Sequence, residues 1–127
     1  MRLSEAEYQA LKHRLKPAQT PIKEPKDKPK MNGLESSYAQ YLDYLKRTGE
    51  IIDWKFEPFN IRLADKCFYK IDFLVITKDK QIELHETKGR WEDDALVKFK
   101  VAAEQFPWFV FKAIMRKDGH FYVERMG

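Results

Sequence analysis

Asp72, Glu86 and Lys88 are the residues of this sequence whose types and spacing could do chemistry. Two aliphatic stretches flank a polar turn centred on Asp79, and this pattern predicts a β-hairpin. In the register that such a turn sets, Asp72 lies opposite Glu86, and Lys88 follows two residues later on the same face. His85 then lies on the opposite face, where we expect a structural role. The aliphatic pairs nearer the turn share the face of Asp72 and are expected to be buried: Leu74 with Leu84, and Ile76 with Ile82.

Two carboxylates that face each other across a strand pair repel, and without a cation the pKa of one of them rises strongly. A divalent metal removes this conflict. Asp72 and Glu86 on a rigid sheet, with the remaining positions left to water and phosphate oxygen, suit magnesium. Lys88 beside the metal could orient an attacking water and offset phosphate charge. The alternative is a solvated strand edge at which Lys88 is only a surface partner of the acids.

The elements that must position these residues follow from hydrophobic periodicity and turn residues. A helix capped by Asn32 precedes four strands, a second helix and a final strand pair. The expected bounds are Gly33–Arg47 for the first helix, Ile52–Phe56, Phe59–Leu63, Phe68–Thr77 and Gln81–Lys88 for the strands, Glu92–Phe106 for the second helix, and Trp108–Met115 and Phe121–Arg125 for the last strands. Without the short strand 59–63 the order is α–β–β–β–α–β–β, which predicts an α/β or α+β fold with helices packed on a sheet.

The first 31 residues differ in composition from the rest of the chain. The net charge of +4 lies entirely within residues 1–30, which hold eight Lys or Arg against four Asp or Glu. Ser4–Leu15 is expected to form a short helix, and the Pro/Lys-rich stretch that follows is expected to be an extended linker. We therefore expect a basic extension over 1–31 and a folded domain over 32–127. Such an extension indicates a polyanionic partner, and a tail that charge merely keeps solvated is the alternative.

Cysteine content and hydropathy exclude several classes of protein. The single cysteine, Cys67, can form neither an internal disulfide nor a zinc cluster, which fits a reducing cytosol. No run of the sequence approaches the roughly 18 apolar residues that span a bilayer. The first residues also lack the apolar block of a signal peptide. We therefore expect a cytoplasmic protein with no membrane association.

Three motifs occur in an order and spacing that resemble a known family. Asp72 together with Glu86-Thr87-Lys88 resembles the Asp…(Asp/Glu)-X-Lys signature of the PD-(D/E)XK nucleases. More narrowly, the motifs are similar to the phage endonuclease I family of Holliday junction-resolving enzymes, and also to small phage nucleases. The motif segments are Asn32–Glu35, Tyr69–Leu74 and Glu86–Asp94. The resemblance runs from about Asn32 to Pro107 and implies a restriction-endonuclease-like core with a mixed central sheet.

The resemblance implies a magnesium-dependent endodeoxyribonuclease, with manganese able to substitute, that leaves 5′-phosphate and 3′-hydroxyl ends. It implies branched DNA as the preferred substrate and a phage protein that acts in the cytoplasm of a bacterial host. Resolving a junction takes two paired cuts, so we expect a homodimer. A nicking, restriction or repair nuclease of the same fold is the alternative within this class. A catalytically silent DNA-binding module and an assembly protein are the alternatives from other classes.

The resemblance also assigns site residues beyond the first three. Glu35 would join the catalytic and metal site, although a capping box with Asn32 would also explain its position. The Thr87 carbonyl would be a further metal ligand. The proline that often precedes the motif aspartate is Ile71 here, which leaves the course of the strand before Asp72 open. Charge and position, rather than the resemblance, suggest the candidate DNA contacts Lys26, Lys28, Lys30, Arg90, Trp91, Lys98 and Lys100. Packing is the alternative for Trp91, and solvent exposure is the alternative for the two helix lysines.

Overall fold

The computed structural model describes residues 4–15 and 30–127, and the chain divides into two compact units, Met1–Lys30 and Met31–Gly127. In the first unit, helix α1 spans Glu5–Leu15, and the Ser4 hydroxyl accepts a hydrogen bond from the Glu7 N–H at 3.1 Å. The expected helix is therefore confirmed, and Ser4 is its N-cap. The linker that follows, with Lys26 and Lys28, lies outside the described residues. In the described part of the chain, no helix is long and apolar enough to cross a membrane.

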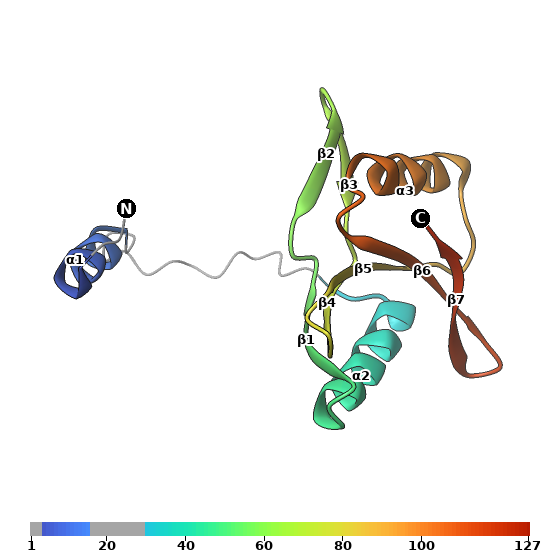
Figure 1. Ribbon diagram of the computed structural model, residues 1–127. Coiled ribbons are helices and arrows are strands. Elements are labelled where there is room, and N and C mark those ends of the chain that lie inside the picture. Colours follow the sequence, from blue (N-terminus) through green and yellow to red (C-terminus); the bar gives the residue numbers. More distant parts are fainter. Residues whose placement is uncertain (1–3, 16–29) are drawn as a thin grey trace. The chain divides into compact units, whose positions relative to one another are not determined.

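The second unit is an α+β domain with a mixed five-stranded sheet (Figure 1). Its strands lie in the order β1-β4-β5-β6-β7, and all neighbours are antiparallel except β5 and β6, which are parallel and are connected through helix α3. A separate two-stranded sheet pairs β2 with β3. The bounds are Gly33–Arg47 (α2), Ile51–Phe56 (β1), Asn60–Ala64 (β2), Cys67–Lys70 (β3), Phe73–Thr77 (β4), Ile82–Thr87 (β5), Asp93–Gln105 (α3), Val110–Lys117 (β6) and His120–Met126 (β7).

Helices α2 and α3 cover opposite faces of the five-stranded sheet and give the domain two hydrophobic cores (Figure 1). Burial of these apolar faces is the main favourable term for such a layered fold. The α2 core contains Tyr38, Ala39, Leu42, Ile51, Phe73, Val75 and Ile114. The α3 core contains Ile61, Tyr69, Ile71, Leu84, Phe99, Ala102, Phe111 and Ala113, so it includes the inner face of the β2–β3 hairpin.

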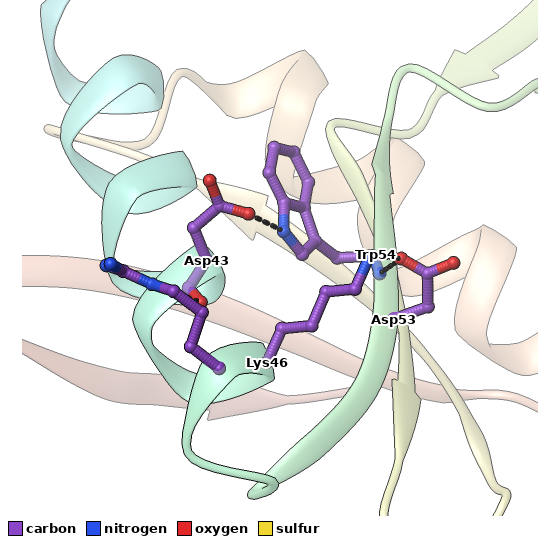
Figure 2. A network of polar contacts seen from close by, with 5 residues as sticks. Asp43, Lys46, Asp53 and Trp54 are labelled. Atoms are coloured by element: carbon purple, nitrogen blue, oxygen red, sulfur yellow. Dashed lines mark hydrogen bonds and ion pairs between the residues drawn. The ribbon is translucent and has the colours of Figure 1, made fainter.

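Helix α2 is also held to strand β1 by a polar network at the edge of the sheet (Figure 2). The Trp54 indole N–H donates to the Asp43 carboxylate at 3.0 Å, and the Trp54 backbone N–H donates to the Asp53 carboxylate at 2.8 Å. Lys46 pairs with the same Asp53 oxygen at 3.0 Å, and its hydrogen bond is the largest cause of the lowered pKa of Asp53. These contacts tie the C-terminal half of α2 to β1.

One expected element is wrong. The strand expected over Phe68–Thr77 is two strands, because the chain bends at Asp72 and passes from the two-stranded sheet to the five-stranded sheet. Residues 67–70 pair with β2, whereas residues 73–77 pair with β1 and β5. The order after α2 is therefore five strands, α3 and two strands, and not the expected α–β–β–β–α–β–β. The bend depends on which strands pair over long range, and a local hydrophobic pattern does not contain that information.

The register of the hairpin around Asp79 is confirmed, with Leu74 opposite Leu84 and Ile76 opposite Ile82. The expectation that this whole aliphatic face is buried is wrong at the turn end. Leu84 is buried in the α3 core, but Ile82 is 38% exposed and neither Ile76 nor Ile82 belongs to either core. The buried part of the face is therefore the half next to Asp72 and Glu86.

Candidate active site

A pocket of about 280 Å³ lies where the bend at Asp72, the end of β5 and the first turns of α3 meet. Three lysines and two acids face it, so its charge is mixed and close to balanced. The lining residues are Phe68, Tyr69, Lys70, Asp72, Glu86, Lys88, Ala95 and Lys98. The structure thus brings together Asp72, Glu86, Lys88 and Lys98, four of the residues that the sequence singled out.

Asp72 lies between the two sheets and is held from both sides. Its backbone carbonyl accepts a hydrogen bond from the Glu57 N–H at 2.7 Å. Its Oδ2 atom accepts from the Thr87 N–H at 2.9 Å and from the Thr87 hydroxyl at 3.1 Å. Its Oδ1 atom accepts no hydrogen bond from the described residues, so this oxygen is available to a cation.

The pKa of Asp72 is raised from 3.8 to about 6. Burial of the carboxylate is the largest cause, and the negative charges of Glu86 and Glu35 add to it. The two hydrogen bonds from Thr87 lower the pKa and offset part of this increase. Carboxylates that are crowded in a partly dry site behave in this way unless a cation accompanies them. One acid of the pair therefore has a raised pKa, as expected, but burial and not the repulsion between the two carboxylates is the largest cause.

Glu86 is 5% exposed, and both of its carboxylate oxygens have partners. Oε1 pairs with the Lys88 ammonium at 3.0 Å, and Oε2 accepts a hydrogen bond from the Tyr69 hydroxyl. Tyr69 is itself buried, and its burial together with the charge of Glu86 raises the pKa of the phenol, which therefore stays protonated and remains a donor. The carboxylate is thus fixed in direction by two donors from different segments of the chain.

Lys88 continues directly from β5, and its backbone N–H donates to the Ile114 carbonyl of β6 at 3.0 Å. Its ammonium also lies 5.8 Å from the centroid of the Trp91 ring, within the range of a cation–π contact. The lysine side chain is only partly exposed. Its charge is therefore held beside Glu86 at the pocket and is not free to move through solvent.

Glu35 forms the complete capping box that its spacing from Asn32 allows. The Asn32 side chain accepts from the Glu35 N–H at 2.8 Å, and the Glu35 carboxylate accepts from the Asn32 N–H at 2.9 Å. The negative charge of Glu35 still contributes to the raised pKa of Asp72. Within residues 4–15 and 30–127, no group of three His, Cys, Asp or Glu side chains is placed to hold a metal ion. The structure therefore brings Asp72 and Glu86 together but does not add Glu35 to a cluster with them.

The remaining candidate DNA contacts differ in their surroundings. Lys98 is half-buried in the pocket, whereas Lys30, Arg90 and Lys100 are exposed. Trp91 packs against Phe99 of the α3 core with ring centroids 5.4 Å apart. Its indole N–H donates to the Glu124 carboxylate at 3.1 Å. The packing role considered for Trp91 is thus confirmed.

Tyr69 is the site residue that the sequence did not reveal as functional. It occurs in the motif segment Tyr69–Leu74, but its partner Glu86 lies in another sheet, and no strand register within the hairpin predicts that contact. The signal that could have found it was alternation. Tyr69 and Ile71 are two residues apart and both are buried in the α3 core, so a tyrosine hydroxyl had to find a partner inside the domain.

His85 lies on the face opposite Glu86, as expected, and belongs to a second polar network beneath α2. Its two ring nitrogens lie 2.6 Å from the Tyr38 hydroxyl and 2.8 Å from a Glu83 carboxylate oxygen. Lys112 also pairs with Glu83 at 3.0 Å. Burial lowers the pKa of His85, so the ring is neutral and bridges a phenol and a carboxylate. Each of these four side chains has a partner within the network, which supports the expected structural role.

No family model, curated protein or solved structure matches this chain. The resemblance to the PD-(D/E)XK nucleases therefore rests on the motif residues of the sequence alone.

Proposed function

We propose that this protein is a metal-dependent endodeoxyribonuclease and that the pocket around Asp72 is its active site. The observation that carries the proposal is the meeting of Asp72, Glu86 and Lys88 in one pocket, next to Lys98. A domain that only bound DNA would gain nothing from two acids facing a phosphate. The mixed sheet with a helix on each face supports a restriction-endonuclease-like core, since it places the three motif residues at neighbouring strand ends.

Magnesium is the cation that fits these donors best, because all of them are oxygen atoms and few enough to leave positions for water and phosphate. Asp72 Oδ1 and Glu86 would hold it, and the resemblance adds the Thr87 carbonyl. When bound, the metal would supply a more acidic water and would stabilise the charge that develops on the phosphate. Manganese should substitute for it, since it accepts the same oxygen ligands.

The chain's own residues then position the remaining partners of the reaction. Lys88 orients the water that attacks phosphorus in line with the leaving oxygen, and Lys98 binds the phosphate from helix α3. The bond between phosphorus and the 3′ oxygen breaks, which leaves a 5′-phosphate and a 3′-hydroxyl. Glu35 acts through its charge from the start of α2, and its capping contact keeps that charge in place.

Branched DNA is the proposed substrate because of the resemblance. Two chains are the proposed unit, because the described part of each chain has one such pocket and a junction needs two cuts. We place this activity in the cytoplasm of a bacterial host. Light scattering on the protein bound to a four-way junction should give the mass of two chains. A single chain on the junction would favour a nicking enzyme of the same chemistry instead.

The decisive experiment compares cleavage by the wild type, Glu86→Gln and Lys88→Ala on supercoiled plasmid, linear duplex, single-stranded DNA and a four-way junction, with magnesium and with chelator. Glu86→Gln should lower the cleavage rate by about a hundredfold or more, since it weakens the metal site. It should keep or improve DNA affinity because it removes a charge that repels phosphate. Lys88→Ala should lower turnover and leave the magnesium dependence largely intact.

Glu104→Gln is the matched control, because Glu104 is exposed on the helix that lines the pocket and its substitution makes the same change of charge. It should cleave like the wild type. Cleavage by Glu86→Gln at the wild-type rate, or wild-type cleavage that persists in chelator, would refute the proposal. DNA binding with no cleavage under any condition would identify the silent binding module.

A further inference from the structure

The β2–β3 hairpin beside the pocket has two faces of opposite character. Its inner face carries Ile61 and Tyr69, which lie opposite each other in the ladder and are buried in the α3 core. Its outer face carries the alternate residues, with Arg62 directly opposite Phe68 and Asn60 directly opposite Lys70. All four outer residues are exposed. The hairpin is therefore anchored on one side and presents two cations and an aromatic ring on the other.

Phe68 is a large apolar residue on the outer face of this hairpin, and its exposure to solvent needs an explanation. Its side chain is 49% exposed, and it lines the same pocket as Asp72 and Glu86. Leaving half of a phenyl ring in water forgoes part of its burial free energy. Single exposed aromatic residues are common on protein surfaces. Phe68, however, lies exposed at the rim of a pocket that is also lined by two carboxylates and three lysines.

The charges around Phe68 favour a nucleic-acid strand as the occupant. Lys70 and Lys98 line the pocket with it, and Arg62 is its cross-strand neighbour. Arg62 is engaged only by Asp65 at 3.8 Å among the described residues, in a pair so exposed that it holds the arginine weakly. Lys70 pairs with Glu57 at 2.9 Å, yet most of its side chain is exposed. Cations beside an exposed aromatic ring are the combination that binds phosphate and base of one strand.

We infer that the outer face of the β2–β3 hairpin binds the DNA strand next to the cleaved phosphate, with Phe68 stacked on an unpaired base and Arg62 on a backbone phosphate. The inference rests on the proposed nuclease function and narrows its substrate. A base inside an intact duplex has no free face to offer a phenyl ring. The site therefore takes DNA in which a nucleotide beside the cut is unpaired, as at a branch, a gap or a single-stranded tail.

The two residues make different contributions, and binding measurements can separate them. We would measure the affinity of the full-length protein for fluorescein-labelled single-stranded DNA, a gapped duplex and an intact duplex by anisotropy in chelator over a range of salt. Phe68→Ala should weaken binding to the single strand and the gapped duplex about tenfold, with no change in the salt slope and less than a twofold change on the duplex. Arg62→Gln should reduce the single-strand salt slope by about 0.7.

Phe68→Trp should bind the single strand and the gapped duplex like the wild type, because an indole ring also stacks on a base. Tyr44→Ala is the control, since Tyr44 is 56% exposed on α2 and lines no part of this pocket. A 2-aminopurine placed beside the cleavage point should be quenched by the wild type and by Phe68→Trp but not by Phe68→Ala. Unfolding temperatures of all variants should match, since these side chains are exposed.

An equal loss on single-stranded and duplex DNA in Phe68→Ala, or no loss at all, would overturn the inference while magnesium-dependent cleavage by the wild type continued to support the proposed function. A wild-type protein that neither binds nor cleaves any of the DNA probes would overturn both.

Discussion

Replacing Asp72 by Asn should make the metal-free protein more stable at neutral pH, although Asp72 is the centre of the proposed site. The side chains have nearly the same shape, so Thr87 can still donate to the amide oxygen. The substitution removes a charge that burial, Glu86 and Glu35 all disfavour. Cation-binding sites often lower the stability of the folded protein when no cation is bound.

The magnitude follows from the raised pKa of Asp72, which is about 6 in the folded protein and 3.8 in the reference state. At 1.36 kcal/mol for each pKa unit, the charged form costs the native state about 3 kcal/mol. Because the folded state binds the proton more tightly, this cost is absent below about pH 4, grows as pH rises and is complete above about pH 7. For a domain of this size, about 3 kcal/mol corresponds to an increase in Tm on the order of 10 °C.

The assay is thermal and urea unfolding of the wild type and Asp72→Asn in chelator at pH 4 and pH 7.5, followed by the same comparison in magnesium. We expect the variant to be more stable at pH 7.5 and nearly equal to the wild type at pH 4. Magnesium should then stabilise the wild type alone. A variant that is less stable at pH 7.5, or a difference that does not depend on pH, would refute the reasoning about crowded carboxylates.

Asp53→Asn is the control, and we expect it to have the opposite effect on stability at neutral pH. The hydrogen bond from Lys46 is the largest cause that lowers the pKa of Asp53, and the backbone N–H of Trp54 adds to it. A lowered pKa means stability that is present at neutral pH and is lost as pH falls below the unfolded value. Asp53→Asn should therefore reduce stability at pH 7.5 and make less difference in acid, and magnesium should act on it as on the wild type.

Two further predictions address the rest of the site and the N-terminal extension. Tyr69→Phe leaves a buried oxygen of Glu86 without its donor, so it should destabilise the domain by about 1–3 kcal/mol. It should also raise the magnesium concentration needed for half-maximal cleavage about tenfold or more. An unchanged magnesium requirement would show that Tyr69 does not position Glu86. Deleting residues 1–30 removes the whole net charge of +4, so it should weaken binding to all DNA shapes alike. It should also reduce the slope of log affinity against log salt concentration by about 0.9 for each duplex phosphate that the extension neutralises. The same slope in the truncated protein would mean that the extension does not contact DNA.

Apart from the break in the strand at Asp72, local patterns in the sequence predicted the elements around the site, and they predicted the register of the β4–β5 hairpin. The turn at Asp79 fixes the pairing of β4 with β5, and alternation then places Glu86 and His85 on opposite faces. The bounds of α2 match the expectation because its cap, its apolar stripe and its terminal residues all agree. These features depend on neighbours within one hairpin or one helix.

The features that the sequence did not reveal depend on contacts between distant segments. The bend at Asp72 arises because β3 finds its partner in β2 and β4 finds its partners in β1 and β5. The contact of Tyr69 with Glu86 joins the two sheets. The capping box explains the position of Glu35 fully by local geometry, and its catalytic role stays a prediction.

The bend at Asp72 also bears on how such a protein could diversify. The hairpin ends in an exposed turn at Asp65 and Lys66, while its root is fixed by Ile61 and Tyr69 against α3. Exposed turns of this kind accept insertions and deletions more readily than any other part of a domain. The β2–β3 hairpin could therefore become longer or shorter, or change its outer residues, during evolution without altering the spacing of the Asp72 and Glu86 carboxylates at its base. In the proposed nuclease, selection could thus change which DNA shapes bind to the hairpin without changing the residues that cleave DNA.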